Sequence, residues 1–370
     1  MNRNPHQGEK NMKKERQSNI ELLKIFSMIG VIILHYNNAT IGNAFAYVSM
    51  PSMKAYALYY LESMFICAVN VFMLISGYFM IESRKIDFRK PIRLLIQVVV
   101  FREFIYLLQV VLTDAVLSLG SVLANLLPAS YFAVLYAAVY VLSPFVNKLM
   151  ISLSRKKLRA FMIIALVLFS VWPFSVDVLE KVKKTAFAGL STIGMYGSQS
   201  GYTVVNFMLM YMIGAYLKIT DIRWNTAVSG AVLVGSWTAL FVFANRLIKA
   251  GIGVGLAWEY CNPLVILSAI AAFLLFKNIR IKSNPVINSL SKATFSVYLL
   301  NSVLILRFAN TQRYVTGSGY VMLLHIVLTC TAICLFSWVA QMIYDRIAGP
   351  VYEWIDKRLK IDMTFSIEDN

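Results

Sequence analysis

Apolar stretches of about twenty residues recur along the whole 370-residue chain. A helix of roughly that length crosses the hydrocarbon layer of a bilayer. Only 14% of the residues are charged and 59% are hydrophobic, whereas about a quarter of the residues in a soluble domain are charged. We therefore expect an all-α, polytopic helix bundle that is solvated by membrane lipid and carries no separate soluble domain.

The apolar stretches predict about ten transmembrane helices. They cover residues 20–40, 57–81, 92–113, 129–150, 158–176, 202–219, 225–245, 258–277, 293–310 and 320–345. The membrane domain is taken as residues 19–347. A polar, basic N-terminal tail is expected over residues 1–18 and a short cytoplasmic C-terminal tail over residues 348–370.

Lysine and arginine are distributed unevenly between alternate loops. Counted from a cytoplasmic N-terminus, the inner segments hold 24 of them and the outer segments hold eight. Cytoplasmic loops carry the excess of positive charge in membrane proteins. Both termini and residues 84–93 are therefore predicted to be cytoplasmic, in a multi-pass protein of the plasma membrane. Topology also accounts for the net charge of +17, so no nucleic-acid partner is expected, and the oligomeric state does not follow from these patterns.

The first apolar stretch carries three ionisable side chains on one stripe. Lys24 and His35 are eleven residues apart, so they project from nearly the same helix face, roughly 16 Å apart along the axis. Glu21 shares that stripe, three residues before Lys24. Ionisable groups at such depth normally face a polar cavity, and an imidazole can act as a general base. We interpret these three as catalytic; a histidine hydrogen-bonded between helices is the structural alternative.

A basic loop follows the second predicted helix. Its cations are Arg84, Lys85, Arg89, Lys90 and Arg93. They suit a polyanionic ligand such as the phosphates of coenzyme A. Topology or lipid headgroups would also place cations at this position.

Other polar side chains interrupt the predicted helices. The ones expected to line a substrate cavity are Asn70, Ser76, Arg102, Glu103, Tyr298 and Asn301. Thr294, Tyr298 and Asn301 follow one another at helical spacing and share a face. A structural hydrogen-bond network between helices is the alternative for all of them. His325 is expected to be structural, and the four cysteines, which form no Cys-x-x-Cys pair, are expected to be buried hydrophobes without a metal.

Four segments of the chain resemble the acyltransferase-3 family of integral membrane acyltransferases, which O-acetylate bacterial polysaccharides. Residues 19–35 look like the family's opening motif, a basic residue and a histidine separated by ten others. Residues 69–78 look like its second-span signature, and residues 88–93 resemble the arginine-rich loop that follows. Residues 292–301 resemble a late span that usually ends Tyr-Leu-x-His.

The chain departs from this pattern at two positions. Lys24 stands where arginine is common, which keeps the charge but loses the bidentate fork. Asn301 stands where the late histidine is usual, and an asparagine cannot take up a proton.

The resemblance implies an O-acyltransferase that moves an acetyl group from cytoplasmic acetyl-CoA to a hydroxyl of a cell-surface or lipid-linked glycan. It implies that His35 is the base, that Arg89, Lys90 and Arg93 hold the donor phosphates, and that Lys24 lines the route between them. The main alternative is an exporter or flippase of surface polysaccharide or its lipid-linked precursor, because a transporter also needs a polar stripe inside its bundle.

Overall fold

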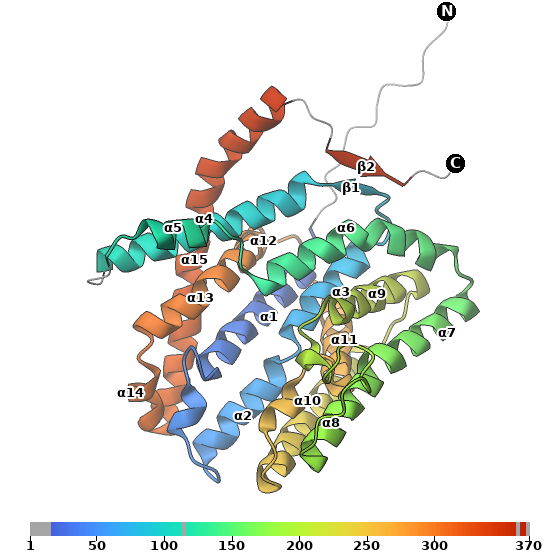
Figure 1. Cartoon of the computed structure of the whole chain (residues 1–370), viewed down its shortest axis with the longest axis vertical. Coiled ribbons are helices and arrows are strands. Elements are labelled where there is room, and N and C mark those ends of the chain that lie inside the picture. Colours follow the sequence, from blue (N-terminus) through green and yellow to red (C-terminus); the bar gives the residue numbers. More distant parts are fainter. Residues whose placement is uncertain (1–15, 113–115, 360–362, 368–370) are drawn as a thin grey trace, which may run out of the picture.

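The computed structural model describes residues 16–112, 116–359 and 363–367. Within them the regular structure is helical, apart from two short strands, β1 (Lys85–Asp87) and β2 (Thr364–Ser366), which pair antiparallel. The predicted all-α class is therefore confirmed (Figure 1). Residues 1–15 of the predicted N-terminal tail, and residues 360–362 and 368–370 of the predicted C-terminal tail, lie outside the described residues.

Eight helical segments in the described part of the chain are long and apolar enough to cross a membrane. They are α1 (Ser18–Asn37), α2 (Met53–Phe65) with α3 (Ala68–Met80), α4 (Arg89–Leu112), α6 (Tyr131–Ser152), α7 (Arg155–Leu166) with a π-helical turn (Val167–Val171) and α8 (Trp172–Lys183), α10 (Thr226–Lys249), η4 (Val254–Trp258) with α11 (Pro263–Asn278), and α15 (Gly319–Leu359). A ninth segment is bent, since α12 (Pro285–Lys292) and α13 (Thr294–Phe308) meet at 55°.

The one remaining predicted stretch, residues 202–219, is α9 (Val204–Thr220), whose 17 residues make it shorter than the segments that pass as spans. Each of the ten predicted stretches thus contains a helix over most of its described residues, and eight or nine of them have the length and composition of a span. The remaining short helices in the described ranges are η1 (Ala44–Tyr47), α5 (Leu119–Asn125), η3 (Gln199–Gly201) and α14 (Thr311–Thr316).

Two helices extend seven or more residues beyond their predicted ends. α8 continues to Lys183, although the predicted stretch ends at residue 176. α15 continues through Pro350 to Leu359. In both cases the apolar stretch ends at charged residues while the helix itself continues, because hydropathy marks the membrane boundary and not the end of the backbone hydrogen bonding.

Side-chain caps fix where many of the helices begin. Caps that accept a hydrogen bond from a backbone N–H of the first turn are Ser52, Ser130, Thr203, Asn225, Asn262 and Asn284. Such caps satisfy donors that would otherwise lack a partner. Pro263 and Pro285 follow two of them in the first turn, where a missing N–H removes no helical hydrogen bond.

α3 and α9 cross with their backbones in close contact. A Cβ added to Gly77 would lie 1.8 Å from the carbonyl oxygen of Tyr211, and one added to Gly214 would lie 1.9 Å from that of Leu74. Small residues permit this close approach between membrane helices. α9 is consequently buried along most of its length, which is how a helix this short is accommodated: protein, not lipid, surrounds it.

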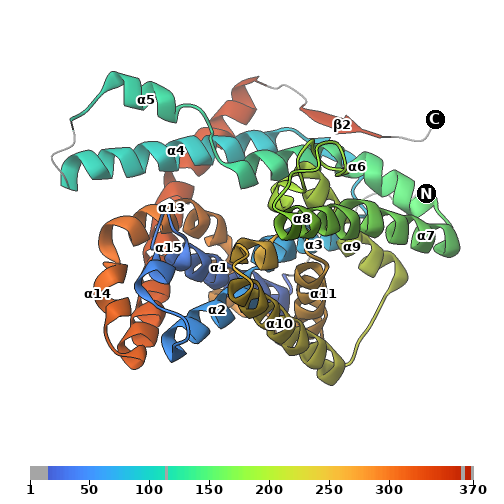
Figure 2. The same cartoon turned by 60° about the horizontal axis from the view of Figure 1, so that its bottom comes forward.

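α4 and α15 lie at the periphery of the bundle and expose many apolar side chains, as lipid-facing helices do. Figure 2 shows α4 with α5 along one edge, while α1 and α11 lie within the bundle.

Segments predicted to share a membrane face are in contact with each other. At the predicted inner face, Asn19 donates to the carbonyl of Phe276 at 3.1 Å and Asn278 donates to that of Trp224 at 2.6 Å, while β1 pairs with β2. At the predicted outer face, Lys54 donates to the carbonyl of Val315 at 2.9 Å. This grouping matches the predicted alternation of loops; the assignment of one face to the cytoplasm stays a prediction of the positive-inside rule.

Candidate active site

His35 lies in the last turn of α1, which is one uninterrupted helix from Ser18 to Asn37. Lys24 and His35 therefore keep the helical geometry that their spacing predicted. The imidazole is partly exposed. Its Nδ1 shares a hydrogen bond with Oδ1 of Asn301 and lies 3.1 Å from Oγ of Ser302. Both partners come from α13, so two helices far apart in sequence define the position of the ring.

The Asn301 side chain is fully buried and fixed by its own helix. Its Nδ2 donates to the carbonyl of Val297 at 2.9 Å and to that of Tyr298 at 2.8 Å. The predicted polar face of α13 thus exists, and it turns Asn301 toward His35. The sequence marked both residues as candidates but gave no reason to place them together.

Lys24 and Glu21 form an ion pair near the start of α1, with 3.1 Å between Nζ and Oε1. Glu21 also accepts a hydrogen bond from Ser291 and lies 3.8 Å from the guanidinium of Arg16. Several donors around one carboxylate compensate the cost of burying it. The ammonium of Lys24 is thereby held in place while its side chain stays 28% exposed.

A cavity of about 520 Å³ opens beside this ion pair. Its walls come from α1, α3, α4, α6 and the bend between α12 and α13. Its polar lining residues are Arg16, Gln17, Glu21, Lys24, Ser76, Tyr136, Ser291, Lys292 and Thr294. Sequence reasoning named Glu21, Lys24 and Ser76 as site residues; Arg16, Ser291 and Lys292 join them only through the fold. The cavity holds three cations beside one carboxylate, so it suits an anionic ligand.

Tyr298 links this cavity to His35. Its ring lies 5.3 Å, centroid to centroid, from that of Phe132, which lines the cavity. Its hydroxyl accepts a hydrogen bond of 3.4 Å from Ser130. Its carbonyl in turn holds the amide of Asn301. The contacts run from the cavity wall through Tyr298 and Asn301 to the imidazole.

The basic residues at the start of α4 are divided between two faces of that helix. Arg89 and Arg93 line a smaller cavity of about 190 Å³ and both approach Asp356 of α15, with 2.6 Å between Arg93 and the carboxylate. Lys90 lies 5.9 Å from the ring centroid of Tyr140. Arg84 contributes its backbone carbonyl, which accepts a hydrogen bond from the N–H of residue 367.

Asp87 precedes this group and pairs with Arg89 at 2.8 Å. Burial alone raises the pKa of the Asp87 carboxyl, but hydrogen bonds from Arg89 and the charges of Arg89 and Lys90 outweigh burial, so that pKa lies below its ordinary value. The carboxylate stays ionised at any pH near neutrality and orients the Arg89 guanidinium.

The other predicted cavity residues lie elsewhere. Asn70 donates to the carbonyl of Tyr260 at 2.8 Å and accepts from Asn206 at 3.2 Å, as a structural tie between helices. Arg102 donates to the carbonyl of Ala129 and to the side chain of Asn125. Oε1 of Glu103 is buried and has no hydrogen-bond partner among the described residues. The structure brings none of these three into the cavity beside Lys24.

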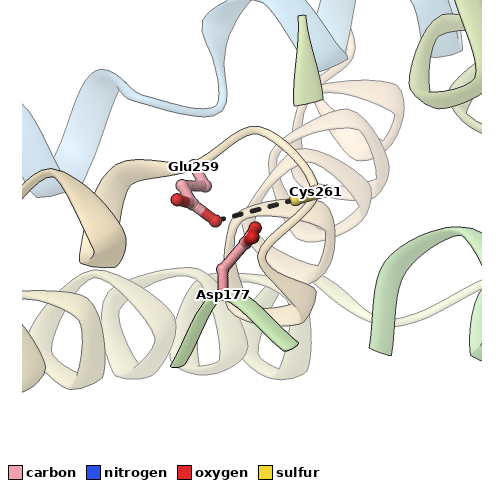
Figure 3. Close-up of side chains that lie close together, drawn as sticks. All are labelled: Asp177, Glu259 and Cys261. Atoms are coloured by element: carbon pink, nitrogen blue, oxygen red, sulfur yellow. Dashed lines mark hydrogen bonds between the residues drawn. The ribbon is translucent and has the colours of Figure 1, made fainter. Parts of the chain in front are cut away.

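A cluster at the predicted outer face was not expected from the sequence. Figure 3 shows Asp177 of α8 and the side chains of Glu259 and Cys261 turned toward one another. The Asp177 carboxylate accepts from the backbone N–H of Ser198 at 3.0 Å, and Glu259 accepts from the Ser198 hydroxyl at 3.5 Å and from the Cys261 thiol at 3.9 Å. Since the carboxyl groups already have hydrogen-bond donors, the cluster explains how the loop that contains Ser198 is held against α8.

Residues 177 and 259 are too distant along the chain for any local pattern to pair them. The three side chains lie near enough to one another to approach one metal ion. The expectation that this protein needs no metal stays a prediction.

His325 has the structural role expected of it. Its Nδ1 lies 2.8 Å from the hydroxyl of Tyr36, and its ring stacks on Tyr314 with 3.9 Å between centroids. Nε2 lies 3.4 Å from the hydroxyl of Thr329. Both ring nitrogens thus have neighbours that hold the histidine between helices. All four cysteines are free, as expected.

Comparison with protein families adds one finding to this geometry. Residues 17–342 match the acyltransferase-3 family, described as an acyltransferase domain. No curated protein and no solved structure gives a significant match. The family match begins at Gln17, one residue before α1, and includes His35, the α4 cations, Tyr298 and Asn301. With most of its length matched and its helices built to span a bilayer, this chain belongs to the acyltransferase-3 family of integral membrane proteins.

Proposed function

We propose that the protein transfers an acetyl group from cytoplasmic acetyl-CoA to a hydroxyl of a cell-surface or lipid-linked glycan. The observation that carries the proposal is the arrangement along α1. A cation-lined cavity lies at the predicted inner end, beside Lys24 and Glu21. A hydrogen-bonded histidine lies farther along the same helix. In this arrangement the donor binds near the start of α1 and proton transfer occurs near its end.

In the proposed reaction, His35 accepts the proton of the acceptor hydroxyl as its oxygen attacks the thioester carbonyl carbon. The bond from that carbon to sulfur breaks, and the thiolate of coenzyme A leaves and regains a proton from the imidazolium. A positioned general base of this kind contributes about 10²–10⁴ in rate. Lys24 lines the donor cavity, where its charge offsets the negative charge of the donor.

The donor phosphates are proposed to lie at the predicted inner rim of the cavity. Arg16, Lys24 and Lys292 line the cavity itself, and Leu94, which follows Arg93 directly, lines it as well. Arg93 is therefore one residue away from the cavity wall, and Lys90 lies one helical turn before Leu94. Arg89, Lys90 and Arg93 are proposed to contact the phosphates where they leave the cavity, since charge-assisted contacts with phosphate are strong.

Purified protein in proteoliposomes tests this function with labelled acetyl-CoA and an oligosaccharide or lipid-linked saccharide acceptor. Release of free coenzyme A thiol together with label in the acceptor supports the proposal. Movement of the saccharide across the bilayer without any consumption of acetyl-CoA supports the exporter alternative and contradicts it.

A further inference from the structure

The orientation of the Asn301 amide is determined by its own helix. Two backbone carbonyls, of Val297 and Tyr298, lie 2.9 and 2.8 Å from one end of the amide. Carbonyl oxygens only accept hydrogen bonds, so this end must be the NH₂ group. Turning the amide over would place an oxygen against both carbonyls and leave buried groups without donors. Oδ1 is therefore the atom that faces His35.

The orientation of the amide in turn determines which nitrogen of His35 carries the hydrogen. Oδ1 of Asn301 has no hydrogen to give, so Nδ1 of the imidazole must be the donor. The hydroxyl of Ser302, at 3.1 Å from the same nitrogen, can accept a share of that hydrogen. No hydrogen bond to Nε2 exists among the described residues. A neutral ring in this setting therefore keeps its lone pair on Nε2.

We infer that Asn301 is the positioning residue of the proposed base: it fixes His35 as the Nδ1–H tautomer, so that Nε2 is the atom that accepts the proton. The inference rests on the proposed function only for its catalytic meaning. When Nε2 gains a proton, the hydrogen on Nδ1 remains there, hydrogen-bonded to Asn301. The ring therefore need not turn or exchange hydrogens during the reaction. An amide at this position cannot become charged, which makes it a permanent acceptor whatever the pH.

The tautomer can be measured directly by nitrogen-15 NMR of histidine-labelled protein in lipid. The chain has three histidines, so His6→Gln and His325→Asn variants assign the spectrum. At alkaline pH, the His35 ring of the native protein is expected to show a protonated Nδ1 and an unprotonated Nε2. A neutral His35 that is protonated on Nε2 overturns the inference, and this outcome needs no variant at position 301.

Two substitutions at position 301 test whether Asn301 sets the tautomer of His35. Asn301→Ala, checked for folding by its melting curve, should lose the preference for Nδ1–H. Asn301→Asp keeps an acceptor for Nδ1 but loses the NH₂ group that donates to the two carbonyls, so it is also checked for folding, and the folded variant should retain the preference. Ser302→Ala is the matched control and should leave the tautomer unchanged. An unchanged tautomer in folded Asn301→Ala, or its loss in Ser302→Ala, assigns the role to Ser302 and overturns that of Asn301.

Kinetics separate positioning from a merely structural role. Asn301→Ala should lower kcat, by less than the roughly 10²–10⁴-fold expected for loss of the base itself, and should leave the KM for acetyl-CoA unchanged. A rise in KM with an unchanged kcat contradicts a positioning role. If the native protein transfers no acyl group, the proposed function fails while the measured tautomer still stands or falls by itself.

Discussion

His35 of α1 shares a hydrogen bond with Asn301 of α13, although 266 positions of sequence separate them. The ionisable groups of α1 therefore belong to two separate sites. Lys24 and Glu21 belong to the cavity near the start of the helix, and His35 belongs to α13, roughly 16 Å farther along at 1.5 Å per residue. Changes near Lys24 should thus affect donor use, and changes around His35 should affect proton transfer.

Replacing Lys24 tests the first of these places. Lys24→Met should lower kcat/KM for acetyl-CoA by roughly 10- to 100-fold, because a lost contact with a charged group costs about 1.5–3 kcal/mol. Lys24→Arg keeps the charge and should retain most activity. Lys218→Met is the matched control: this lysine lies over the Tyr78 ring, 5.3 Å from its centroid, and does not line the cavity. Equal losses in the Lys24→Met and Lys218→Met proteins would contradict a role for Lys24 in donor use.

The α4 cations are tested by steady-state kinetics in the donor. Substituting Arg89, Lys90 and Arg93 by glutamine should raise the KM for acetyl-CoA and leave the KM for the acceptor alone, because only the donor carries these phosphates. Asp356→Asn is added to the triple variant because Arg93 pairs with that carboxylate at 2.6 Å. Removing Arg93 alone would leave the charge of Asp356 uncompensated.

Arg223→Gln provides the control for the α4 variant. Arg223 lies at the same predicted face and pairs with Asp221 at 2.6 Å, outside both cavities. Its substitution should leave the donor KM unchanged. An unchanged donor KM in the α4 variant as well would mean that these cations serve topology only.

Cysteine labelling tests the orientation. The four native cysteines are buried or half-buried, so a single introduced cysteine dominates labelling by a membrane-impermeant reagent in intact cells. Lys85→Cys and Arg223→Cys should be protected, and Lys54→Cys and Lys184→Cys should be labelled, because positive charge accumulates on the cytoplasmic side. Labelling of residue 85 from outside would reverse the assigned topology and place the donor cavity on the wrong face.

The pH dependence of transfer should have an acid limb that belongs to His35. A protonated imidazole has no lone pair for the acceptor proton, so the rate should fall as pH decreases. The Asp87–Arg89 pair should not contribute. A carboxyl whose folded-state pKa is lowered keeps its stabilising charge above its unfolded value of about 3.9 and loses it only as pH falls through the lower folded value.

Asp87→Asn separates the two origins of an acid limb. Between about pH 5 and pH 8 the native carboxylate at position 87 stays ionised by the same reasoning, so the substitution should leave the midpoint of the pH–rate curve unchanged. A midpoint that moves with residue 87 would show that donor binding, and not the imidazole, sets the acid limb.

The sequence predicted the helices well because hydropathy and length act locally. Each of the ten apolar stretches is helical over most of its described residues, and the stripe of Glu21, Lys24 and His35 lies on one uninterrupted helix. Helical spacing also placed Tyr298 and Asn301 on one face of α13. These features depend on residues within one helix, and the local pattern is sufficient to fix them.

Contacts between helices could not be predicted in this way. No periodicity relates His35 to Asn301, Glu21 to Ser291, or Asp177 to Glu259, since each pair depends on how whole helices pack. The span count is the same kind of case: protein surrounds the 17-residue α9 because Gly77 and Gly214 let α3 and α9 approach closely. The shared partner of Arg89 and Arg93 is Asp356, more than 260 residues later in the chain, so no local pattern predicts that pairing.

The most direct test of the account is acetyl transfer by purified His35→Asn protein, compared with the native protein and with His325→Asn. Asparagine keeps a similar size and can hydrogen-bond, but it cannot accept a proton. We predict that His35→Asn folds, retains acetyl-CoA binding and loses transfer by about 10²–10⁴-fold, while His325→Asn stays active. Transfer by His35→Asn at a rate close to that of the native protein would contradict the account, because no proton acceptor would then be required at that position.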